Sequence, residues 1–231
     1  MQYVKQLIAD GYVGKVLSTS LIASGMAWGG MSPAADAYVN DINNGATMLT
    51  IPFSHTIEAV CGALGEFQSL NAVISNNFKE ATVIETGEKI PKSAEDQLII
   101  GGLLESGTPI SLHYRGGVSL GTNFLWDING TDGDLLLTGP GGHTQFMEPS
   151  LRGGKRGDKH LADMPVPDTY RWVSDEVPPG PPLNVAQTYF RLAEDLKKGT
   201  CQVATFQDAV ARHRLIECIR AAANTGANQN I

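Results

Sequence analysis

The sequence predicts an α+β fold, an open and mostly antiparallel β-sheet with helices packed on one side. Three observations support this prediction. The middle of the chain contains segments with the two-residue alternation of strands. Two turns that contain glycine join four of these segments into hairpins. Two segments near the end of the chain have the polar N-terminal residues and the apolar spacing of helices.

The N-terminal part of the chain is expected to form helix, strand and helix in turn. Residues 1–11 place apolar side chains on one helical face, and Gly11 is typical of a helix end. Residues 16–25 have the character of a strand, and residues 45–64 are expected to be helical. Pro52 must kink or restart that last helix, because it removes the hydrogen bond to the carbonyl four residues back.

The sheet is predicted from the strands that follow one another along the middle of the chain. These are residues 68–76, a hairpin over 96–117 and a second hairpin over 123–139. The turns are expected at Ser106–Gly107 and Asp132–Gly133. Within the first hairpin, "ISLHYR" alternates apolar and polar side chains, so one face of the sheet should pack on a core and the reverse face should be polar.

A loop-rich excursion is predicted for residues 139–182, which are rich in glycine, proline and charge. Short strands are expected within it, over 144–147 and near Trp172. The basic run Arg152–Lys159 is interpreted as a solvated loop.

Two helices are predicted to close the chain. The first begins at Asn184 with Gln187 three residues on, and the second begins at Thr205 with Asp208 three residues on. Both spacings are those of a capping box. The first helix has apolar residues at helical spacing, namely Val185, Tyr189, Leu192 and Leu196.

Composition limits the class of protein. The 231 residues suffice for one large domain or two small ones, and the net charge of −7 argues against broad binding to nucleic acid or an anionic membrane. Three cysteines far apart in sequence suggest neither a disulfide framework nor a zinc site. No signal peptide or membrane span is recognisable. A cytoplasmic protein is therefore expected.

Familiar catalytic motifs are absent from the sequence. There is no glycine-rich nucleotide loop, no nucleophile elbow and no H-E-x-x-H, and the five histidines lack the spacing of metal ligands. His213 lies among apolar residues at helical spacing, with Glu217 one turn on. We interpret it as a packed histidine beside a carboxylate, in preference to a catalytic one.

Five segments in order carry a resemblance to a known family. They are "LIADGYVGKV", "NNGATMLTIPFSHTIE", "LNAVISNN", "INGTDGDLLL" and "DAVARHRLIECI". Together they resemble the C-terminal domain of the glucose–fructose oxidoreductase / inositol dehydrogenase / rhizopine-catabolism (Gfo/Idh/MocA) family. Within it they are most similar to the branch that contains the yeast galactose-regulon repressor. The match spans nearly the whole chain and weakens across residues 139–182.

The resemblance implies an organisation in two domains. An N-terminal Rossmann domain would bind NAD or NADP, and a C-terminal open sheet would cover the nicotinamide, contact a small sugar-like substrate and form homodimers or higher oligomers. Residues 1–231 then form a single domain of the second kind, without the Rossmann domain and with no cofactor-binding residue of their own. No binding of nucleic acid, membrane or metal is implied.

The resemblance also bears on "GATMLTIPFSH". Catalytic members resemble G-G-G-x-L-x-D-x-G-x-H, in which the Asp and His reach the substrate. Gly45, Leu49 and His55 match this pattern, but Ile51 stands at the aspartate and Phe53 at the last glycine. An isoleucine can neither orient a histidine nor raise its pKa. His55 is therefore either a general acid–base or a residue kept for packing.

Three further residues are candidate substrate contacts. Tyr38 and Asn44 lie in the preceding loop, and Glu58 is the nearest acidic residue on the helix face of His55. Two functions stay open. One is the substrate-binding and oligomerisation domain of an NAD(P)-dependent sugar or polyol oxidoreductase-like protein, inactive without its nucleotide-binding domain. The other is a non-catalytic regulatory or scaffold module.

Overall fold

The computed structural model describes all 231 residues. The helices are α1 (Gln2–Ala9), α2 (Ser54–Leu64), α3 (Pro181–Lys198) and α4 (Phe206–Thr225). The strands are β1 (Val16–Gly25), β2 (Met31–Ser32), β3 (Phe67–Ser75), β4 (Glu80–Val83), β5 (Lys89–Pro91), β6 (Gln97–Leu104), β7 (Pro109–Gly116), β8 (Phe124–Gly130), β9 (Gly133–Gly139), β10 (Ser150–Lys155), β11 (Ala162–Asp163) and β12 (Gln229–Asn230).

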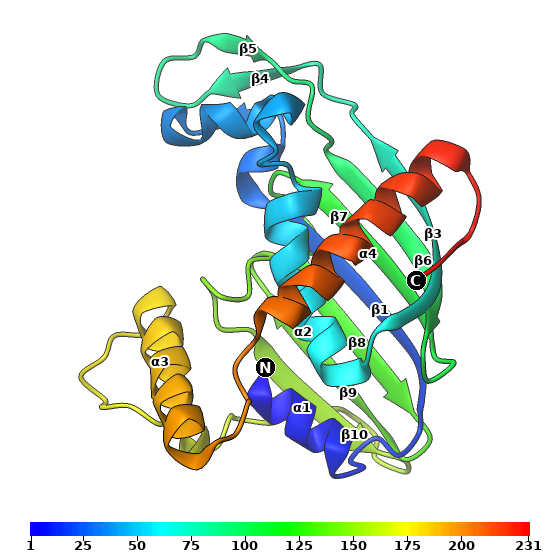
Figure 1. The fold of residues 1–231 in the computed structure, drawn as a ribbon, viewed down its shortest axis with the longest axis vertical. Helices are drawn as coiled ribbons and strands as arrows, with labels where there is room; N and C mark the ends of the chain where they lie inside the picture. Colours follow the sequence, from blue (N-terminus) through cyan, green and yellow to red (C-terminus); the bar gives the residue numbers. More distant parts are fainter.

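A nine-stranded sheet dominates the fold, in the order β11-β10-β9-β8-β1-β7-β6-β3-β12. β1 separates the two predicted hairpins. It runs parallel to β7 and antiparallel to β8, and every other neighbouring pair in this sheet is antiparallel. A small sheet of β2, β4 and β5 lies at one end (Figure 1). The predicted α+β class is confirmed.

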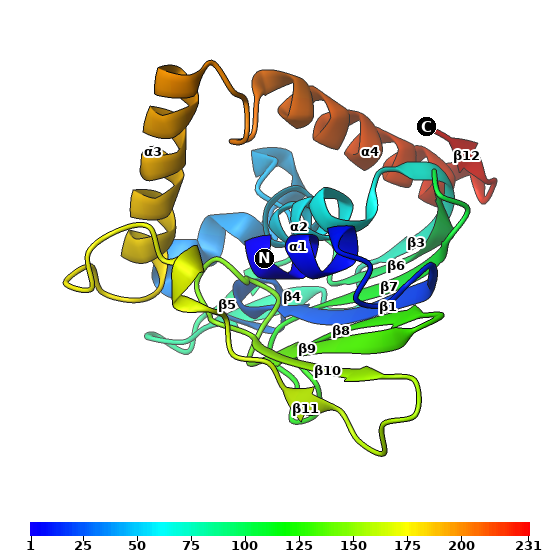
Figure 2. The same ribbon diagram turned by 90° about the horizontal axis from the view of Figure 1, so that it is seen from below.

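The core lies between the large sheet and the helices. α1, α2 and α4 cover one face of the sheet, while the opposite face has no helix (Figure 2). Alternate residues of the central strands point inward and are almost fully buried, including Tyr114, Phe124, Trp126 and Ile128. Trp126 Nε1 donates a hydrogen bond to Thr19 Oγ1 over 2.9 Å, which satisfies the one polar atom of this buried ring.

The helix–strand–helix order of the N-terminal part agrees with its prediction. α1 ends two residues before Gly11, whose φ of 72° is the left-handed conformation that glycine adopts without strain. Pro52 restarts the second helix, as expected. It lies in a π-helical turn, Leu49–Phe53, in which the amide of Phe53 donates to Met48 O five residues back.

Several predictions for residues 131–182 are wrong. Gly133 begins β9, so the turn residues are Thr131 and Asp132. No strand forms over 144–147 or at Trp172. The strand is β10 instead, which extends the sheet beside β9 and includes the first half of the basic run Arg152–Lys159. The glycines of this run predicted a loop. In the structure Gly153 lies in β10, where a Cβ would lie 2.3 Å from the sulfur of Met164, so the close packing of this strand requires a glycine.

The start and the surroundings of α3 also differ from prediction. The helix begins at Pro181, so Asn184 and Gln187 lie inside it and form no capping box. Its apolar stripe does not reach the core, since Tyr189 is 65% and Leu196 is 79% exposed. α3 stands apart from the sheet (Figure 2). At α4 the predicted capping box of Thr205 and Asp208 is present. None of the helices is both long and apolar enough to cross a bilayer.

Candidate functional site

His55 lies in the first turn of α2, directly after the π-helical turn, and its side chain is exposed. The backbone there is held locally, because the hydroxyl of Ser54 donates to Leu49 O over 2.9 Å. Ile51, at the place of the implied catalytic aspartate, is partly buried and packs against the core. A carboxylate at that position would lose this packing, so the local structure suits an apolar side chain.

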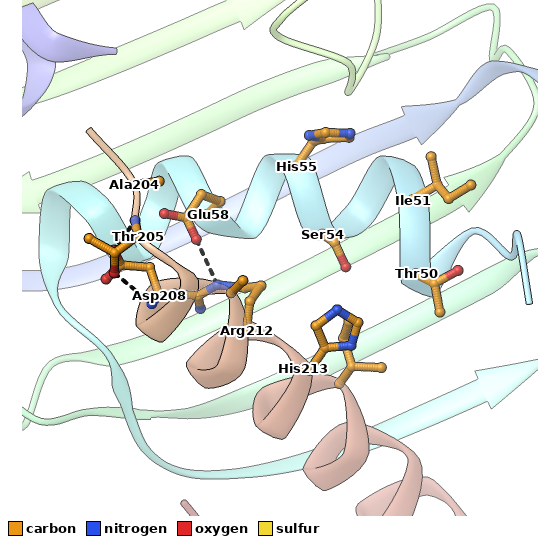
Figure 3. Close-up of a pocket in the computed structure, with 12 residues that line it drawn as sticks. Thr50, Ile51, Ser54, His55, Glu58, Ala204, Thr205, Asp208, Arg212 and His213 are labelled. Atoms are coloured by element: carbon orange, nitrogen blue, oxygen red, sulfur yellow. Dashed lines mark hydrogen bonds and ion pairs between the residues drawn. The ribbon is translucent and has the colours of Figure 1, made fainter. Parts of the chain in front are cut away.

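A pocket of about 290 Å³ lies between α2 and α4, and we call it the α2–α4 pocket. Its walls carry His55, Glu58 and Ile51 from the α2 side and Asp208, Arg212 and His213 from α4. Figure 3 shows Ser54 and Glu58 facing α4, while His55 projects from the other side of α2. The tertiary structure therefore brings two of the predicted site residues, His55 and Glu58, to one pocket.

Arg212 forms the closest contact across this pocket. Its Nε donates to Glu58 Oε2 over 2.8 Å, and Nη2 donates to Glu66 Oε1 over 2.7 Å (Figure 3 shows the first pair). Nη1 lies 3.0 Å from Cys61 Sγ. Burial raises the pKa of the Cys61 thiol to about 12, so this cysteine is a neutral packing group. The role of Arg212 is not visible in the sequence, because its partners lie 146 to 154 residues away.

Both carboxylates of the α2–α4 pocket are thus engaged by groups other than His55. Glu58, the nearest acidic residue on the helix face of His55, forms an ion pair with Arg212, and its predicted substrate contact stays a prediction. Asp208 Oδ2 accepts hydrogen bonds from the amide and the hydroxyl of Thr205, at 2.6 and 2.7 Å. The arrangement can bind and orient a polar group, but it offers His55 no carboxylate to form a catalytic dyad.

His213 lines the same pocket and is exposed, so the interpretation as a packed histidine is wrong. Glu217, its expected partner, forms an ion pair with Arg220 at 2.8 Å instead. The apolar face assumed for this part of α4 is open only at its N-terminal end, since Phe206 is 94% exposed whereas Ile216 is 3% exposed and packs in the core. The core contacts of α4 come from the next face, which carries Leu215 and Ile219.

Tyr38 and Asn44 lie together but do not line the α2–α4 pocket. Asn44 Nδ2 donates to Tyr38 O over 2.8 Å, and both residues are exposed. Neighbouring Asp41 caps its own turn by accepting from the amide of Asn43. The structure assigns this loop a local role and leaves the predicted substrate contacts of Tyr38 and Asn44 as predictions.

A second histidine, His143, lies near His55 and was not singled out by sequence analysis. It is 7% exposed, and its ring centroid is 6.5 Å from that of His55 and 5.7 Å from that of Trp28. Burial and the neighbouring His55 lower the pKa of His143 to about 4. Because it is neutral at physiological pH, it can pack against aromatic rings without a counterion. No group of three or more His, Cys, Asp or Glu side chains is arranged to hold a metal ion.

The chain's glycine-rich turns do not fit a dinucleotide. A pyrophosphate needs open backbone amides at a helix N-terminus that follows a strand. After β1 the chain enters a short 3-10 turn, where a Cβ on Gly29 would lie 2.6 Å from Gly117 Cα. In the turn after β9, a Cβ on Gly142 would lie 2.2 Å from the hydroxyl of Tyr114. These glycines allow close packing within the domain and leave no cradle for phosphate.

Comparison with known proteins decides the family. A family model described as "Gal80p, C-terminal domain" matches residues 1–139. The chain belongs to this family. It is 32% identical over 172 residues to the galactose/lactose metabolism regulatory protein GAL80 of Saccharomyces cerevisiae, a match that covers 69% of this chain and 40% of the regulator. The aligned part of the chain thus spans 40% of the length of that Gal80 protein.

A more distant relative has the name of an enzyme. The chain is 24% identical over 233 residues to the dehydrogenase aclE of Aspergillus oryzae, covering 96% of this chain and 58% of the dehydrogenase. The Gal80-like domain is thus also related to a dehydrogenase, which agrees with the oxidoreductase resemblance seen in sequence.

Solved structures have the same fold. A super-repressor mutant of Gal80p from Saccharomyces cerevisiae superposes with a TM-score of 0.86 at 24% identity, covering 100% of this chain and 62% of that one. Levoglucosan dehydrogenase, in complex with NADH and L-sorbose, superposes with a TM-score of 0.76 at 16% identity, covering 99% and 62%. This Gal80-like C-terminal domain therefore shares its fold with part of Gal80p and with part of levoglucosan dehydrogenase, whose structure was solved in complex with NADH.

Proposed function

We propose that this chain is the non-catalytic C-terminal domain of a Gal80-type regulatory protein, and that it acts by binding partner proteins. One observation carries the proposal. His55 has no carboxylate to act with, because Ile51 replaces the implied aspartate and Arg212 engages Glu58 at 2.8 Å. Identity of 32% to the yeast regulator supports the same function.

The chemical argument concerns the acid–base pair. A histidine that moves a proton during hydride transfer needs a partner that holds its tautomer and stabilises the imidazolium. Glu58 could serve only if it left the cation of Arg212. Arg212 is 7% exposed, so that exchange would leave a buried charge with one carboxylate fewer. Glu58 therefore cannot hold Arg212 and at the same time act as the catalytic partner of His55.

We further propose that the domain forms a homodimer through the uncovered face of the large sheet. A row of facing residues crosses six neighbouring strands there: Val73, Ile99, His113, Ile22, Leu125 and Thr138. Val73 is 59% and Ile99 is 48% exposed. A pleated face with several open apolar residues suits a second copy of the same face, because an isologous contact needs one self-complementary surface.

The function is tested in the protein that joins this domain to the nucleotide-binding domain that the family resemblance implies. Reduction of NAD and NADP is followed with a panel of sugars and polyols, for the wild type and for His55→Ala. We expect the wild type to show no more turnover than His55→Ala. We also expect this substitution to change the free energy of unfolding by no more than about 0.5 kcal/mol, because the side chain is exposed. Turnover that falls about 10²–10⁴-fold on this substitution would reject the regulatory proposal.

A second candidate is the substrate-binding domain of an NAD(P)-dependent sugar or polyol oxidoreductase-like protein. The similarity to the dehydrogenase aclE over 96% of the chain favours it. In this case His55 acts alone as general acid–base, and the other domain binds the cofactor. The turnover experiment separates the two candidates. We also propose a cytoplasmic location, supported by three cysteines that form no disulfide.

A further inference from the structure

A second cavity, of about 500 Å³, lies at the base of α3, and we call it the α3 pocket. Its volume is in the range of pockets that hold small molecules. Its walls come from α1, from residues 137–172, from α3 and from residues 202–204, and His55 lies at its edge. Most of these residues follow position 139, where the match to the Gal80p family ends. Most of the lining therefore lies beyond the residues that the family model matches, although the Gal80p structure superposes on the whole chain.

One wall of the α3 pocket is aromatic and apolar. The rings of Tyr3 and Tyr170 lie 5.2 Å apart. Trp172 also lines the pocket, and its ring stacks at an interplanar angle of 20° on Phe190, which is not a lining residue. Leu137 and Leu151 continue this wall toward the sheet. Such a surface fits the body of a small organic molecule, since ring and hydrocarbon surfaces gain free energy when they are removed from water.

Polar groups that face the pocket have unused hydrogen-bonding capacity. The guanidinium of Arg191 lies 4.3 Å from the centroid of Trp172. None of the structure's ion pairs involves Arg191. Its neighbour one turn on, Asp195, accepts instead from Thr200 and from the amides of Gln202 and Val203. Arg191 donates none of the structure's side-chain hydrogen bonds, so its N–H groups are available, although, after the hydrogen bond from Thr200, its charge also helps to lower the pKa of nearby Asp195.

Two glutamines complete the polar part of the wall. Gln187 Oε1 accepts from the amide of Trp172 over 2.8 Å, so its NH₂ group remains available as a second donor. Gln145 Oε1 is buried and has no donor. An unpartnered buried acceptor is unfavourable, so a ligand hydroxyl that donates to it would recover free energy. Because this oxygen is closed off from solvent, the contact forms once the side chain of Gln145 turns toward the cavity.

We propose that the α3 pocket binds a small hydroxylated organic acid. Its carboxylate or phosphate group pairs with Arg191 and the NH₂ of Gln187, its body lies on the aromatic wall, and its hydroxyl donates to Gln145. Glu148 is the one carboxylate among the lining residues and is exposed, so it weakens anion binding only modestly. The inference rests on this geometry and is independent of the proposed regulatory function.

Titration calorimetry of the chain with mandelate, mandelamide and phenyl phosphate tests the proposal. Mandelate and mandelamide have the same ring and hydroxyl and differ in charge, and phenyl phosphate distinguishes a phosphate group from a carboxylate. We expect saturable binding of at least one anion, and binding of mandelamide about tenfold to a hundredfold weaker than that of mandelate. Absence of saturable binding by both anions, or equal affinity for mandelate and its amide, would overturn the proposal.

Variants locate the binding site. Arg191→Gln should weaken anion binding about tenfold or more, Arg191→Lys should weaken it less because the charge remains, and Glu148→Gln should strengthen it slightly. The matched control is Arg214→Gln, an exposed arginine on α4 outside the α3 pocket. If Arg191→Gln disturbs the fold, the Lys variant and the comparison of mandelate with mandelamide still decide the question. Anion affinity that is unchanged in Arg191→Gln, or that falls equally in Arg191→Gln and Arg214→Gln, would contradict the assignment.

Discussion

Arg212 Nε on α4 donates a 2.8 Å hydrogen bond to Glu58 Oε2 on α2, so a buried cation joins the two helices that form the α2–α4 pocket. The contact spans 154 residues of sequence. It positions α4 across α2, and it also removes Glu58 as a partner for His55. One interaction thus stabilises the domain and limits what its pocket can catalyse.

Replacing Arg212 should destabilise the domain. Arg212→Met removes hydrogen bonds to Glu58, Glu66 and Cys61 and leaves two carboxylates without a cation. Because both carboxylates are about half exposed, water compensates part of the loss, and we expect the free energy of unfolding to fall by about 2–3 kcal/mol. Urea denaturation measures it. Arg214→Met, on the same helix and exposed, is the control, with a change within about 0.5 kcal/mol. If Arg212→Met also lowered the free energy of unfolding by no more than about 0.5 kcal/mol, the contact would contribute little to stability.

His143 should make stability depend on pH. Its pKa in the folded state is about 4, below the ordinary value of 6.5, because of burial and the nearby His55. Between these values the unfolded chain binds the extra proton, so stability is full above pH 6.5 and is lost as the pH falls toward 4. Thermal unfolding across this range should show a weaker acid dependence in His143→Gln than in the wild type. Parallel pH profiles for the two proteins would contradict the assignment.

The uncovered sheet face should control the oligomeric state. We expect light scattering to give twice the chain mass of 24.6 kDa at tens of micromolar protein. Ile99→Glu, beside Val73 in the row of facing residues, should give the monomer mass with an unchanged fold, because it would place a carboxylate at the proposed contact. Val185→Glu on α3 changes an equally open apolar residue away from this face, and should leave the dimer intact. A monomer in the wild type would count against the interface.

NADH and NADPH should not bind this chain appreciably on its own. The glycines that follow β1 and β9 serve close packing, and no strand leads into a helix N-terminus that could receive the pyrophosphate. Titration of each reduced cofactor, followed by its fluorescence, is the measurement. Albumin at the same concentration is the control for nonspecific changes in cofactor fluorescence. Saturable binding at low micromolar concentration would require a cofactor site that these residues do not form.

Local patterns in the sequence were sufficient for most elements. The bounds predicted for β1 agree with the structure, and Gly11, Pro52 and the Thr205–Asp208 box act at the predicted places. These features depend on backbone conformation and on neighbours within four residues, so they are encoded locally. The five ordered segments also identified the family correctly, because together they preserve a pattern that no single motif contains.

Other features were decided only by tertiary structure. β10 is a strand because β9 offers an edge to pair with, and its glycines, which predicted a loop, allow that close approach. The apolar spacing of α3 predicted a packed helix, but this apolar stripe is exposed in the structure. Periodicity shows that one face of a helix is apolar, and it does not show which part of the protein covers that face.

The sequence by itself determined that the implied aspartate is Ile51, and hence that His55 lacks its usual partner. It could not determine what Glu58 does, because the competing cation, Arg212, is 154 residues away and is brought near only when α4 crosses α2. The same holds for the α3 pocket, where Tyr3, Gln145 and Arg191 meet from three distant segments. Side-chain identity is a local property of the chain, whereas the partner that satisfies each charge is chosen by long-range packing.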